Sequence, residues 1–438
     1  MNAVSRFAVE HRPPGALRPY ARNARRHSKR QVRQIADSIK RFGFTNPVLI
    51  SDEDEIIAGP GRVEAAKLLG LETVPTLKLS HLSEAERRAY VLADNKLALN
   101  AGWDADILAV ELQALVDLDF DVTLTGFSLA EVDLTLDAAR DRQPSGRDAA
   151  DRVPLSAGPP VSRKGDLWIL GRHRLLCGDA RNGADYDRLM DGAEADLILT
   201  DPPYNVEIDG YVAGNGRIRH REFAMGAGEM SEADFIAFLT EALGHHARCA
   251  RDGAIAFVCM DWRHMGEVLA AGKVVFSELK NLCVWNKTNA GMGTFYRSKH
   301  ELVFVYKVGT APHTNTFGLG NERYRTNVWD YAGVNSGGKV RAEAIQLHPT
   351  AKPVAMVADA IRDCSRRGEI VLDAFGGSGT TLIAAELCGR ICHMMEFDPA
   401  YADTIVRRYQ AVTGKAGVLE GTGLNFEAVE AERLSEIA

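Results

Sequence analysis

The chain has 438 residues, of which 46% are hydrophobic and 25% are charged, as is usual for a globular protein. Its length favours two domains over one. No apolar run approaches the ~20 residues that a membrane helix needs, and the polar, arginine-rich start of the chain predicts no signal peptide. The seven cysteines are scattered and lack the paired spacing of a zinc site. We therefore expect a cytoplasmic protein with free thiols, no metal and no membrane partner.

Charge is distributed unevenly. The net charge of −7 by itself argues against a nucleic-acid partner. Residues 1–41, however, carry eleven Lys or Arg and two acids, a balance of +9 (11 − 2). Blocks of one sign matter more than totals for binding a polyanion, so this segment favours DNA. The alternative is a solvated basic arm.

The first part of the chain predicts a compact α+β unit over residues 1–138. The expected elements are helices over 31–42 and 63–69 and strands over 47–50, 55–58 and 74–79, followed by helices to about residue 139. Residues 139–164, which are rich in Pro, Gly, Ser, Asp and Arg, predict a linker. A second domain is expected over 165–412, and residues 413–438 as a peripheral helix or a loose tail.

Three segments of this first unit carry a family pattern: residues 35–39 (IADSI), residues 46–48 (NPV), and residues 57–62 (IAGPGR), closed by 65–70 (AAKLLG). Their order resembles the ParB/sulfiredoxin-like domain. In nucleotide-hydrolysing relatives the glycine box holds an acid and paired arginines, whereas this chain has Pro60 and Gly61 there and keeps only Arg62. The resemblance therefore implies DNA docking or a scaffold in preference to nucleotide hydrolysis or nuclease chemistry.

Two motifs later in the chain follow short apolar runs that are typical of buried strands. Asp201-Pro202-Pro203-Tyr204 follows residues 196–200, and a glycine-rich segment over 373–380 follows residues 369–372. Glycines allow the sharp turn from a strand into a helix, and the unpaired amides at the helix start carry partial positive charge. Such a loop is typical of nucleotide-like ligands in α/β sheets.

The next apolar run ends at Glu396, 23 positions after Asp373, where such folds place a carboxylate for ribose hydroxyls. The two motifs together resemble the DNA adenine methyltransferases of the permuted (beta) class, over residues 165–410. That resemblance implies a seven-stranded, Rossmann-like α/β fold and S-adenosylmethionine as cofactor. The loop residues it implies in cofactor binding are Asp373, Phe375, Gly376, Gly377, Ser378, Gly379 and Thr380.

The resemblance implies further cofactor contacts. The segment 348–353 (HPTAKP) lines the methionine end in that class, which makes Thr350 and Lys352 candidates. Asp179, in the segment 177–180 (CGDA), is expected to meet the adenine, although a turn or helix cap is the plainer interpretation. Ala374 stands where the family usually has proline, a change that loosens the turn but removes no contact group.

Residues 201–204 suit catalysis because of what an exocyclic amine needs in order to react. The lone pair of an exocyclic amine is delocalised into the ring, so two acceptors aimed at its hydrogens are needed to direct it at a methyl donor. The Asp201 carboxylate and the Pro202 carbonyl form such a pair, Pro203 stiffens the loop, and Tyr204 offers a face for an extruded base. Methyl transfer then needs mainly alignment.

Other acceptors are less favoured. Ring-carbon methylation of cytosine commonly uses a Pro-Cys pair, which this sequence lacks. Amino-cytosine enzymes usually have Ser in place of Asp201, and protein glutamine methylation tends to use Asn there. Adenine is therefore the favoured target base, and methylation of the cytosine amino group stays open as the alternative.

Two basic segments are candidates for contact with double-stranded DNA. The expected DNA-binding side chains are Arg217, Arg219 and Arg221 after the catalytic motif, and Arg323, Arg325, Lys339 and Arg341 in the insert over 310–345, where the class places target recognition. Rivals of another kind are a ParB-like DNA-binding regulator with an inactive methyltransferase half and a restriction–modification fusion with an N-terminal nuclease. A homodimer and a cognate restriction nuclease stay open as partners.

Overall fold

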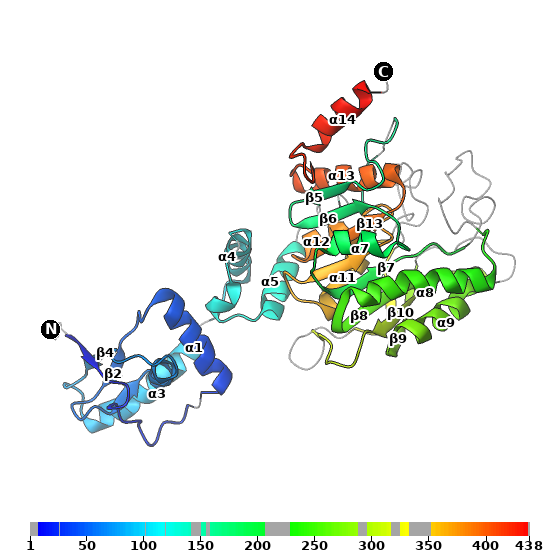
Figure 1. Cartoon of the computed structure of the whole chain (residues 1–438). Coiled ribbons are helices and arrows are strands. Elements are labelled where there is room, and N and C mark those ends of the chain that lie inside the picture. Colours follow the sequence, from blue (N-terminus) through cyan, green and yellow to red (C-terminus); the bar gives the residue numbers. More distant parts are fainter. Residues whose placement is uncertain are drawn as a thin grey trace. The chain divides into compact units, whose positions relative to one another are not determined.

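The computed structural model describes residues 8–25, 27–100, 102–118, 120–141, 150–154, 158–205, 228–287, 296–316, 325–332 and 352–436. The chain forms two compact units, residues 1–142 and 143–438 (Figure 1). Within the described ranges, no helix is both long and apolar enough to cross a membrane. All seven cysteines are buried free thiols, as predicted.

The N-terminal unit is built on a four-stranded sheet of order β1-β4-β2-β3, in which β4 lies parallel to β2 and antiparallel to β1. Its elements are β1 (Val9–Arg12), α1 (Lys29–Phe42), β2 (Val48–Ile50), β3 (Ile56–Ala58), α2 (Pro60–Leu68), β4 (Val74–Lys78), α3 (Glu84–Asn100), α4 (Ala105–Asp117), η1 (Val122–Thr125) and α5 (Leu129–Asp141). The predicted strands and helices are confirmed to within a few residues. This is the α+β unit that the sequence predicts.

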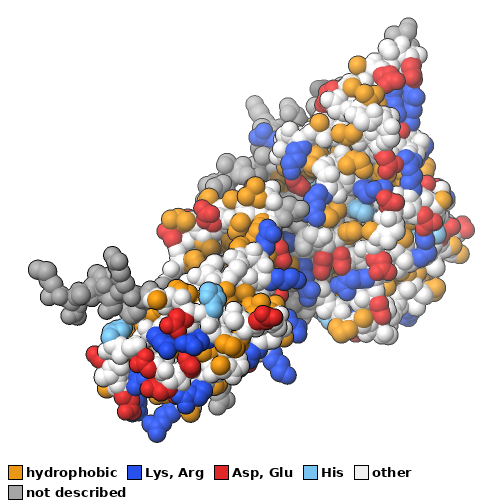
Figure 2. Space-filling model, turned by 60° about the vertical axis from the view of Figure 1, so that its left-hand side comes forward, with side chains coloured by type: hydrophobic (Ala, Val, Ile, Leu, Met, Phe, Trp, Pro, Cys, Tyr) orange, Lys and Arg blue, Asp and Glu red, His pale blue; other side chains and the backbone are white. Residues whose placement is uncertain are grey.

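Much of the basic segment is folded. Helix α1 is capped by the Ser28 hydroxyl, which accepts a hydrogen bond from the Gln31 amide at 3.2 Å. Five of the eleven basic residues lie exposed on it: Lys29, Arg30, Arg33, Lys40 and Arg41. Elsewhere the two signs mix, and Figure 2 shows Lys and Arg interspersed with Asp and Glu over the surface in view. The densest positive charge of the unit is therefore carried by one helix.

The helices that follow form a small core of their own. Leu112 of α4, Val122 of η1 and Val132 of α5 are buried against one another. The ring of Phe120 stacks on Phe42 at 6.2 Å and links this helical part to α1. The expected helical extension is therefore a packed subdomain within the first unit.

The second unit is an α/β fold around a ten-stranded mixed sheet of order β11-β9-β10-β8-β7-β12-β13-β6-β5-β14. Its elements are β5 (Leu167–Leu170), β6 (His173–Cys177), α7 (Gly183–Met190), β7 (Ala195–Thr200), α8 (Glu232–Arg248), β8 (Ala250–Met260), η2 (Trp262–His264), α9 (Met265–Val275), β9 (Glu278–Asn286), β10 (His300–Lys307), β11 (Val328–Asp330), α11 (Val354–Cys364), β12 (Ile370–Asp373), α12 (Thr380–Leu387), β13 (Ile391–Glu396), α13 (Pro399–Thr413), β14 (Val418–Leu419) and α14 (Phe426–Ser435).

Five neighbouring strands, β8-β7-β12-β13-β6, run parallel, and β10 lies antiparallel between β8 and β9. With β10 and β9 they make the seven strands expected of this fold, and the three remaining strands extend the two edges. Parallel strands covered on both faces read as continuous apolar runs, which is why β7 and β12 stand out in the sequence.

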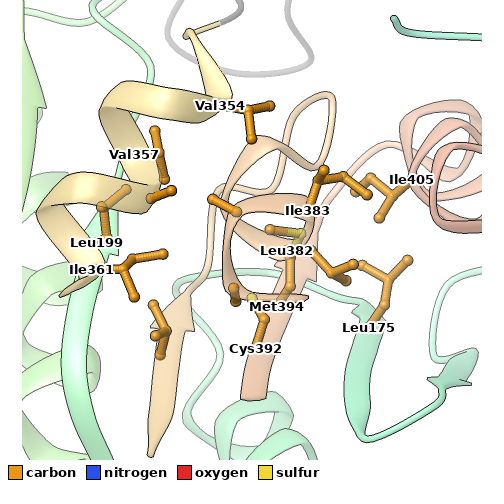
Figure 3. Packing of buried hydrophobic residues seen from close by; sticks show 14 of the residues in the cluster. Leu175, Leu199, Val354, Val357, Ile361, Leu382, Ile383, Cys392, Met394 and Ile405 are labelled. Carbon is orange, nitrogen blue, oxygen red and sulfur yellow. The ribbon is translucent and has the colours of Figure 1, made fainter. Parts of the chain in front are cut away.

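Helices cover both faces of the sheet. Leu197 and Leu199 of β7 point to a core shared with α11, α12 and α13, whereas Ile198 points to a core shared with α8 and α9. This alternation follows from the two-residue period of a strand. Figure 3 shows Val357 and Ile361 of α11 facing Leu199, with residues of α12 and β13 beside them.

The segment predicted as a linker is partly built into this unit. Ala150 and Val161 are buried in its core, and the amides of Val161 and Ser162 donate to the Asp403 carboxylate at 2.6 and 2.8 Å. Periodicity could not reveal this packing because single apolar residues carry it. The end of the chain is packed too: β14 pairs with β5, and Phe426 of α14 packs on Trp168 at 5.2 Å.

Candidate active site

Four predicted motifs meet at one edge of the sheet. Strands β6, β13, β12 and β7 are parallel neighbours, with Cys177 opposite Glu396, Asp373 opposite Met394, and Leu372 opposite Ile198. Their carboxyl ends therefore lie side by side. Ligands of open α/β sheets bind outside the carboxyl ends of the strands, so this edge is the candidate active site.

The glycine loop turns from β12 into α12 and is closely packed against its neighbours. Gly377 and Gly379 have φ of +53° and +81°, and Gly379 is the residue before the first helical residue, Thr380. A Cβ on Gly376 would lie 2.9 Å from the Met394 side chain. Only glycine fits such positions without strain, which lets the chain pass close to β13 as it turns.

Glu396 is tied to this loop. One carboxylate oxygen accepts from the Gly377 amide at 2.7 Å, and the other accepts from the Asp398 amide at 2.8 Å. Burial raises the pKa of Glu396 to about 7, although both amide hydrogen bonds act in the opposite direction. The predicted acid thus lies directly against the predicted loop.

Asp373 anchors the start of the loop. Its carboxylate is buried and accepts from the Thr200 hydroxyl at 3.2 Å and from the Phe375 amide at 3.1 Å. Burial raises the pKa of Asp373 to about 7. The side chain therefore fastens the loop to the end of β7, beside Asp201.

The Ala374 amide is held by a residue that the sequence did not indicate. It donates to Nε2 of the buried His246, from α8, at 3.3 Å, and the imidazole stacks on the Phe375 ring at 6.2 Å between centroids. Nδ1 of His246 pairs with the Ala242 carbonyl at 2.8 Å. Proline at 374 would have no amide to donate, so the hydrogen bond to His246 restrains the turn that we expected to be loose.

The end of the loop is held by an arginine. Arg408, from α13, is buried, and its guanidinium donates to the Ser378 carbonyl at 2.8 Å and to the Thr380 hydroxyl at 3.2 Å. It also donates to the Ala150 carbonyl at 2.8 Å. Burial lowers the pKa of Arg408 to about 10. One side chain thus joins the loop to the segment that precedes β5.

Asp179 follows β6 and lies next along the edge. Its carboxylate accepts from the Arg181 guanidinium at 2.8 Å and from the Arg181 amide at 3.0 Å. Burial raises the pKa of Asp179, but the bonds from Arg181 prevail and lower it. Nearby, the Lys164 ammonium bonds the Phe397 carbonyl and lies 3.0 Å from the centre of the Phe397 ring.

The Asp201 carboxylate has partners on both oxygens. Oδ1 accepts from the Tyr204 hydroxyl at 2.6 Å, and Oδ2 accepts from the Lys352 ammonium at 2.5 Å. Burial and the neighbouring Asp201 raise the pKa of Tyr204, so the phenol stays a proton donor. Pro202 is buried, and the Asn205 side chain fixes the chain after the motif by bonding the Met230 carbonyl at 2.8 Å.

Two charged residues that the sequence analysis did not assign complete this cluster. Glu301 of β10 lies 3.3 Å from the Lys352 ammonium and accepts from Lys287, which follows β9. Burial raises the pKa of Glu301, but the two ammonium groups prevail and lower it. An acid directly before the apolar run of β10, residues 302–306, was the available signal.

Several predicted residues lie outside the described residues: Thr350, Arg217, Arg219, Arg221, Arg323, Lys339 and Arg341. Arg325 is described, and it pairs with Asp359 at 3.1 Å and with Asp363 at 3.2 Å. Its guanidinium also lies 5.1 Å from the Trp329 ring. These contacts give Arg325 a structural role, and its contact with DNA stays a prediction. Among the described residues, no group of three or more His, Cys, Asp or Glu could hold a metal ion.

Comparison with known families covers most of the chain. Residues 195–407 match the DNA methylase family, residues 4–96 the ParB N-terminal domain, and residues 106–164 the ParB-methyltransferase HTH domain. The last match spans part of the helical subdomain and the segment that we had expected to be only a linker.

Individual relatives agree with this division. The chain is 49% identical over 83 residues to the ParB-like nuclease domain-containing protein YnaK of Escherichia coli (strain K12), a match that covers 19% of this chain and 95% of YnaK. It is 24% identical over 226 residues to the type II methyltransferase M2.MboI of Moraxella bovis, covering 50% of this chain and 81% of that protein. A crystal structure of the M1.HpyAVI–SAM complex aligns with a TM-score of 0.40 at 21% identity, covering 53% of this chain and 97% of that one.

The family match and the motifs at the sheet edge define the class: an S-adenosylmethionine-dependent DNA methyltransferase that modifies an exocyclic amino group, N6 of adenine or N4 of cytosine. More particularly, this DNA methylase domain follows, in the sequence, an N-terminal domain that belongs to the ParB N-terminal family. The methylase and HTH domains make DNA the partner of the protein.

Proposed function

We propose that the protein methylates the N6 amino group of adenine at a specific sequence in duplex DNA. The observation that carries the proposal is the Asp201 carboxylate at the end of β7, next to the glycine loop and held by Tyr204 and Lys352. An acidic acceptor suits adenine, because amino-cytosine enzymes of this class usually have Ser at that position.

The first step is capture of the amine. Asp201 and the Pro202 carbonyl accept the two hydrogens of N6, which directs the nitrogen lone pair out of the ring. Pro203 keeps the loop rigid, so the two acceptors need no reorganisation when the base arrives. S-adenosylmethionine supplies an electrophilic methyl group on its sulfonium.

The residues present fit this cofactor. Its ribose hydroxyls would be held by Glu396, whose buried carboxylate already accepts amide hydrogens at the loop, and its methionine part would lie along the glycine loop between β12 and α12. Asp373 holds the loop in register with β7. Asp179, at the far end of the edge, is the candidate for the adenine, and Thr350 for the methionine end.

The target base must leave the helix, because N6 cannot reach a buried methyl donor while it is stacked. The Tyr204 ring lies beside the amine acceptors and is the proposed stacking face. The insert over 310–345 is proposed to read the sequence, and the basic residues 217–221 to contact phosphates.

We assign the N-terminal unit a docking role on DNA. The exposed basic face of α1 supports this assignment, as does the adjoining HTH match. In the glycine box, the Arg62 guanidinium donates to the Asn46 carbonyl at 2.9 Å. It also lies 2.6 Å from the position that a Cβ of Gly59 would take. Arg62 thus supports the turn at the start of α2.

The test is methylation of DNA by the purified protein, followed by mass analysis of the nucleosides. N6-methyladenine that depends on S-adenosylmethionine and is lost in Asp201→Ala supports the proposal. N4-methylcytosine would refute the choice of base. Absence of any methylated base with several DNA sources, from protein that binds the cofactor, would favour a DNA-binding regulator.

A further inference from the structure

Four charged side chains of alternating sign run from the catalytic loop to the end of β9. The Lys352 ammonium lies 2.5 Å from Asp201 and 3.3 Å from Glu301, and Glu301 also pairs with Lys287. Lys352 and Glu301 are almost fully buried, with side chains 4% and 9% exposed, whereas Asp201 and Lys287 are 26% and 27% exposed. The cluster is thus buried in its middle and open at both ends.

Ion pairs of this kind need not stabilise the fold. Burying charged groups costs free energy that their mutual attraction only partly returns, and apolar replacements of similar volume are often as stable. The four residues come from separate segments: the ends of β7 and β9, the start of β10, and the turn before α11. A buried ion pair, Lys352 with Glu301, that contacts the catalytic loop therefore indicates a role in the reaction.

The contacts of Lys352 identify that role. An ammonium group has three hydrogens to donate. Lys352 directs them at Asp201, at Glu301 and at the Tyr204 hydroxyl, which lies 3.1 Å away. No donor is left for the carboxylate of a cofactor, although the family resemblance suggested that contact.

We propose that Lys352 and Glu301 are positioning residues for Asp201: Glu301 fixes Lys352, and Lys352 holds the Asp201 carboxylate in one orientation, facing the target amine. The inference rests on the proposed role of Asp201 as acceptor of the amine hydrogens. Lys287 balances the second charge of Glu301 at the open end.

The direction of the pKa shift of Lys352 agrees with its contacts to the two carboxylates. Burial would lower the pKa of Lys352, but Asp201 and Glu301 prevail and raise it. The other groups near the pair are the Tyr204 phenol, the buried Cys259 thiol and Asp373. None of these three supplies a positive charge.

Removing the ammonium group would leave Asp201 and Glu301 as two carboxylates facing each other, balanced only by Lys287. Like charges in one site favour protonation of one member. The amine acceptor would then be lost as the pH falls. This consequence separates the proposal from a role in packing, which would not depend on pH.

The experiment compares wild type, Lys352→Met, Glu301→Gln and the double variant in single-turnover methylation between pH 5.5 and 9, with cofactor saturating. Lys352→Met is expected to be slower by about 100-fold at pH 7, as for a misplaced reacting group, and to recover as the pH rises. The double variant, which has no facing carboxylates, should exceed Lys352→Met at pH 6. Lys280→Met, at an exposed position of β9, is the matched control.

Binding of S-adenosylhomocysteine, measured by calorimetry, gives a second readout and should be nearly unchanged in Lys352→Met. Parallel loss of binding and rate with an unshifted pH profile would make Lys352 a cofactor contact and overturn the proposal. A double variant slower than Lys352→Met at every pH would also overturn it. If Lys352→Met does not fold, Lys352→Gln allows the same comparison.

The proposed function and this inference can fail separately. N4-methylcytosine from wild type refutes the proposed base but leaves the pH comparison valid. The pH dependence of unfolding needs no activity at all: the lowered pKa of Glu301 adds stability that is lost as the pH falls through it. In Lys352→Met that contribution should vanish, so its stability deficit at pH 7 should shrink as the pH falls below 4.5, the ordinary pKa of a glutamate. A constant deficit contradicts the proposal.

Discussion

His246 offers a quantitative test of how the glycine loop is held. The imidazole is buried, accepts the Ala374 amide hydrogen and stacks on Phe375. Burial lowers its pKa from 6.5 to about 4. Only the neutral ring can accept that hydrogen at Nε2, so the folded protein keeps His246 neutral where the unfolded chain would protonate it.

This difference in protonation sets the sign and the size of the change in the free energy of unfolding with pH. Between pH 6.5 and about pH 4 the unfolded chain holds more protons than the folded one, so the free energy of unfolding falls as the pH falls. A shift of 2.5 pKa units corresponds to about 3 kcal/mol over that interval. His246→Leu removes both the titrating group and the acceptor, and leaving the Ala374 amide without its acceptor costs about 1–3 kcal/mol at pH 7.

The measurement is urea unfolding of wild type and His246→Leu from pH 4 to pH 7.5. The variant should be less stable at pH 7, and the difference should shrink or reverse by pH 4.5. Asp373 and Glu396, whose pKa values are both raised to about 7, act with the opposite sign, because their contributions are lost as the pH rises. They are common to both proteins and cancel in the difference, so a difference that does not change with pH refutes the reasoning.

Three further predictions concern the site and the DNA. Asp201→Ala should abolish methylation and leave S-adenosylhomocysteine binding nearly intact by calorimetry, because the carboxylate acts on the amine; equal losses of both would move Asp201 into the cofactor site. Glu396→Ala and Gly377→Val should instead weaken that binding, one by removing a ribose acceptor and the other by adding a side chain at φ +53°; normal binding in both would contradict the loop assignment. Removing residues 1–140 should keep cofactor affinity but lower DNA affinity, reducing the log–log salt slope by about 0.9 per lost phosphate contact; an unchanged slope would mean that this unit does not touch phosphates.

The sequence predicts which residues lie at the carboxyl ends of the strands better than it predicts contacts between distant segments. Apolar runs that end in Asp201, Asp373 and Glu396 mark strands whose ends hold polar groups, and parallel pairing then brings those ends together. Local pattern is sufficient here because each motif is contiguous. The same logic explains why the elements of the N-terminal unit are confirmed within a few residues.

Contacts between distant segments could not be predicted in this way. Lys352 meets Glu301 only because β10 lies two strands from β7 in the sheet, an order that no local pattern specifies. His246 reads as one polar position in an amphipathic helix, yet it holds the loop. Val161 and Ser162 lie in a segment of linker-like composition, but their amides are bound by Asp403, 241 positions beyond Ser162.

The three carboxylates at the ends of neighbouring strands differ in the groups that contact them. Asp373 and Glu396 are buried without a cation in contact and are held by backbone amides or a hydroxyl, and their pKa values are raised. Among the described residues, Asp201 is the one of the three that contacts a buried ammonium, that of Lys352. A group that fastens a loop can do so in either protonation state, whereas a group that must accept hydrogens from an amine needs its charge. In the part of the edge that the structure describes, the buried Lys352 therefore lies beside the carboxylate that we propose as the acceptor of the amine hydrogens.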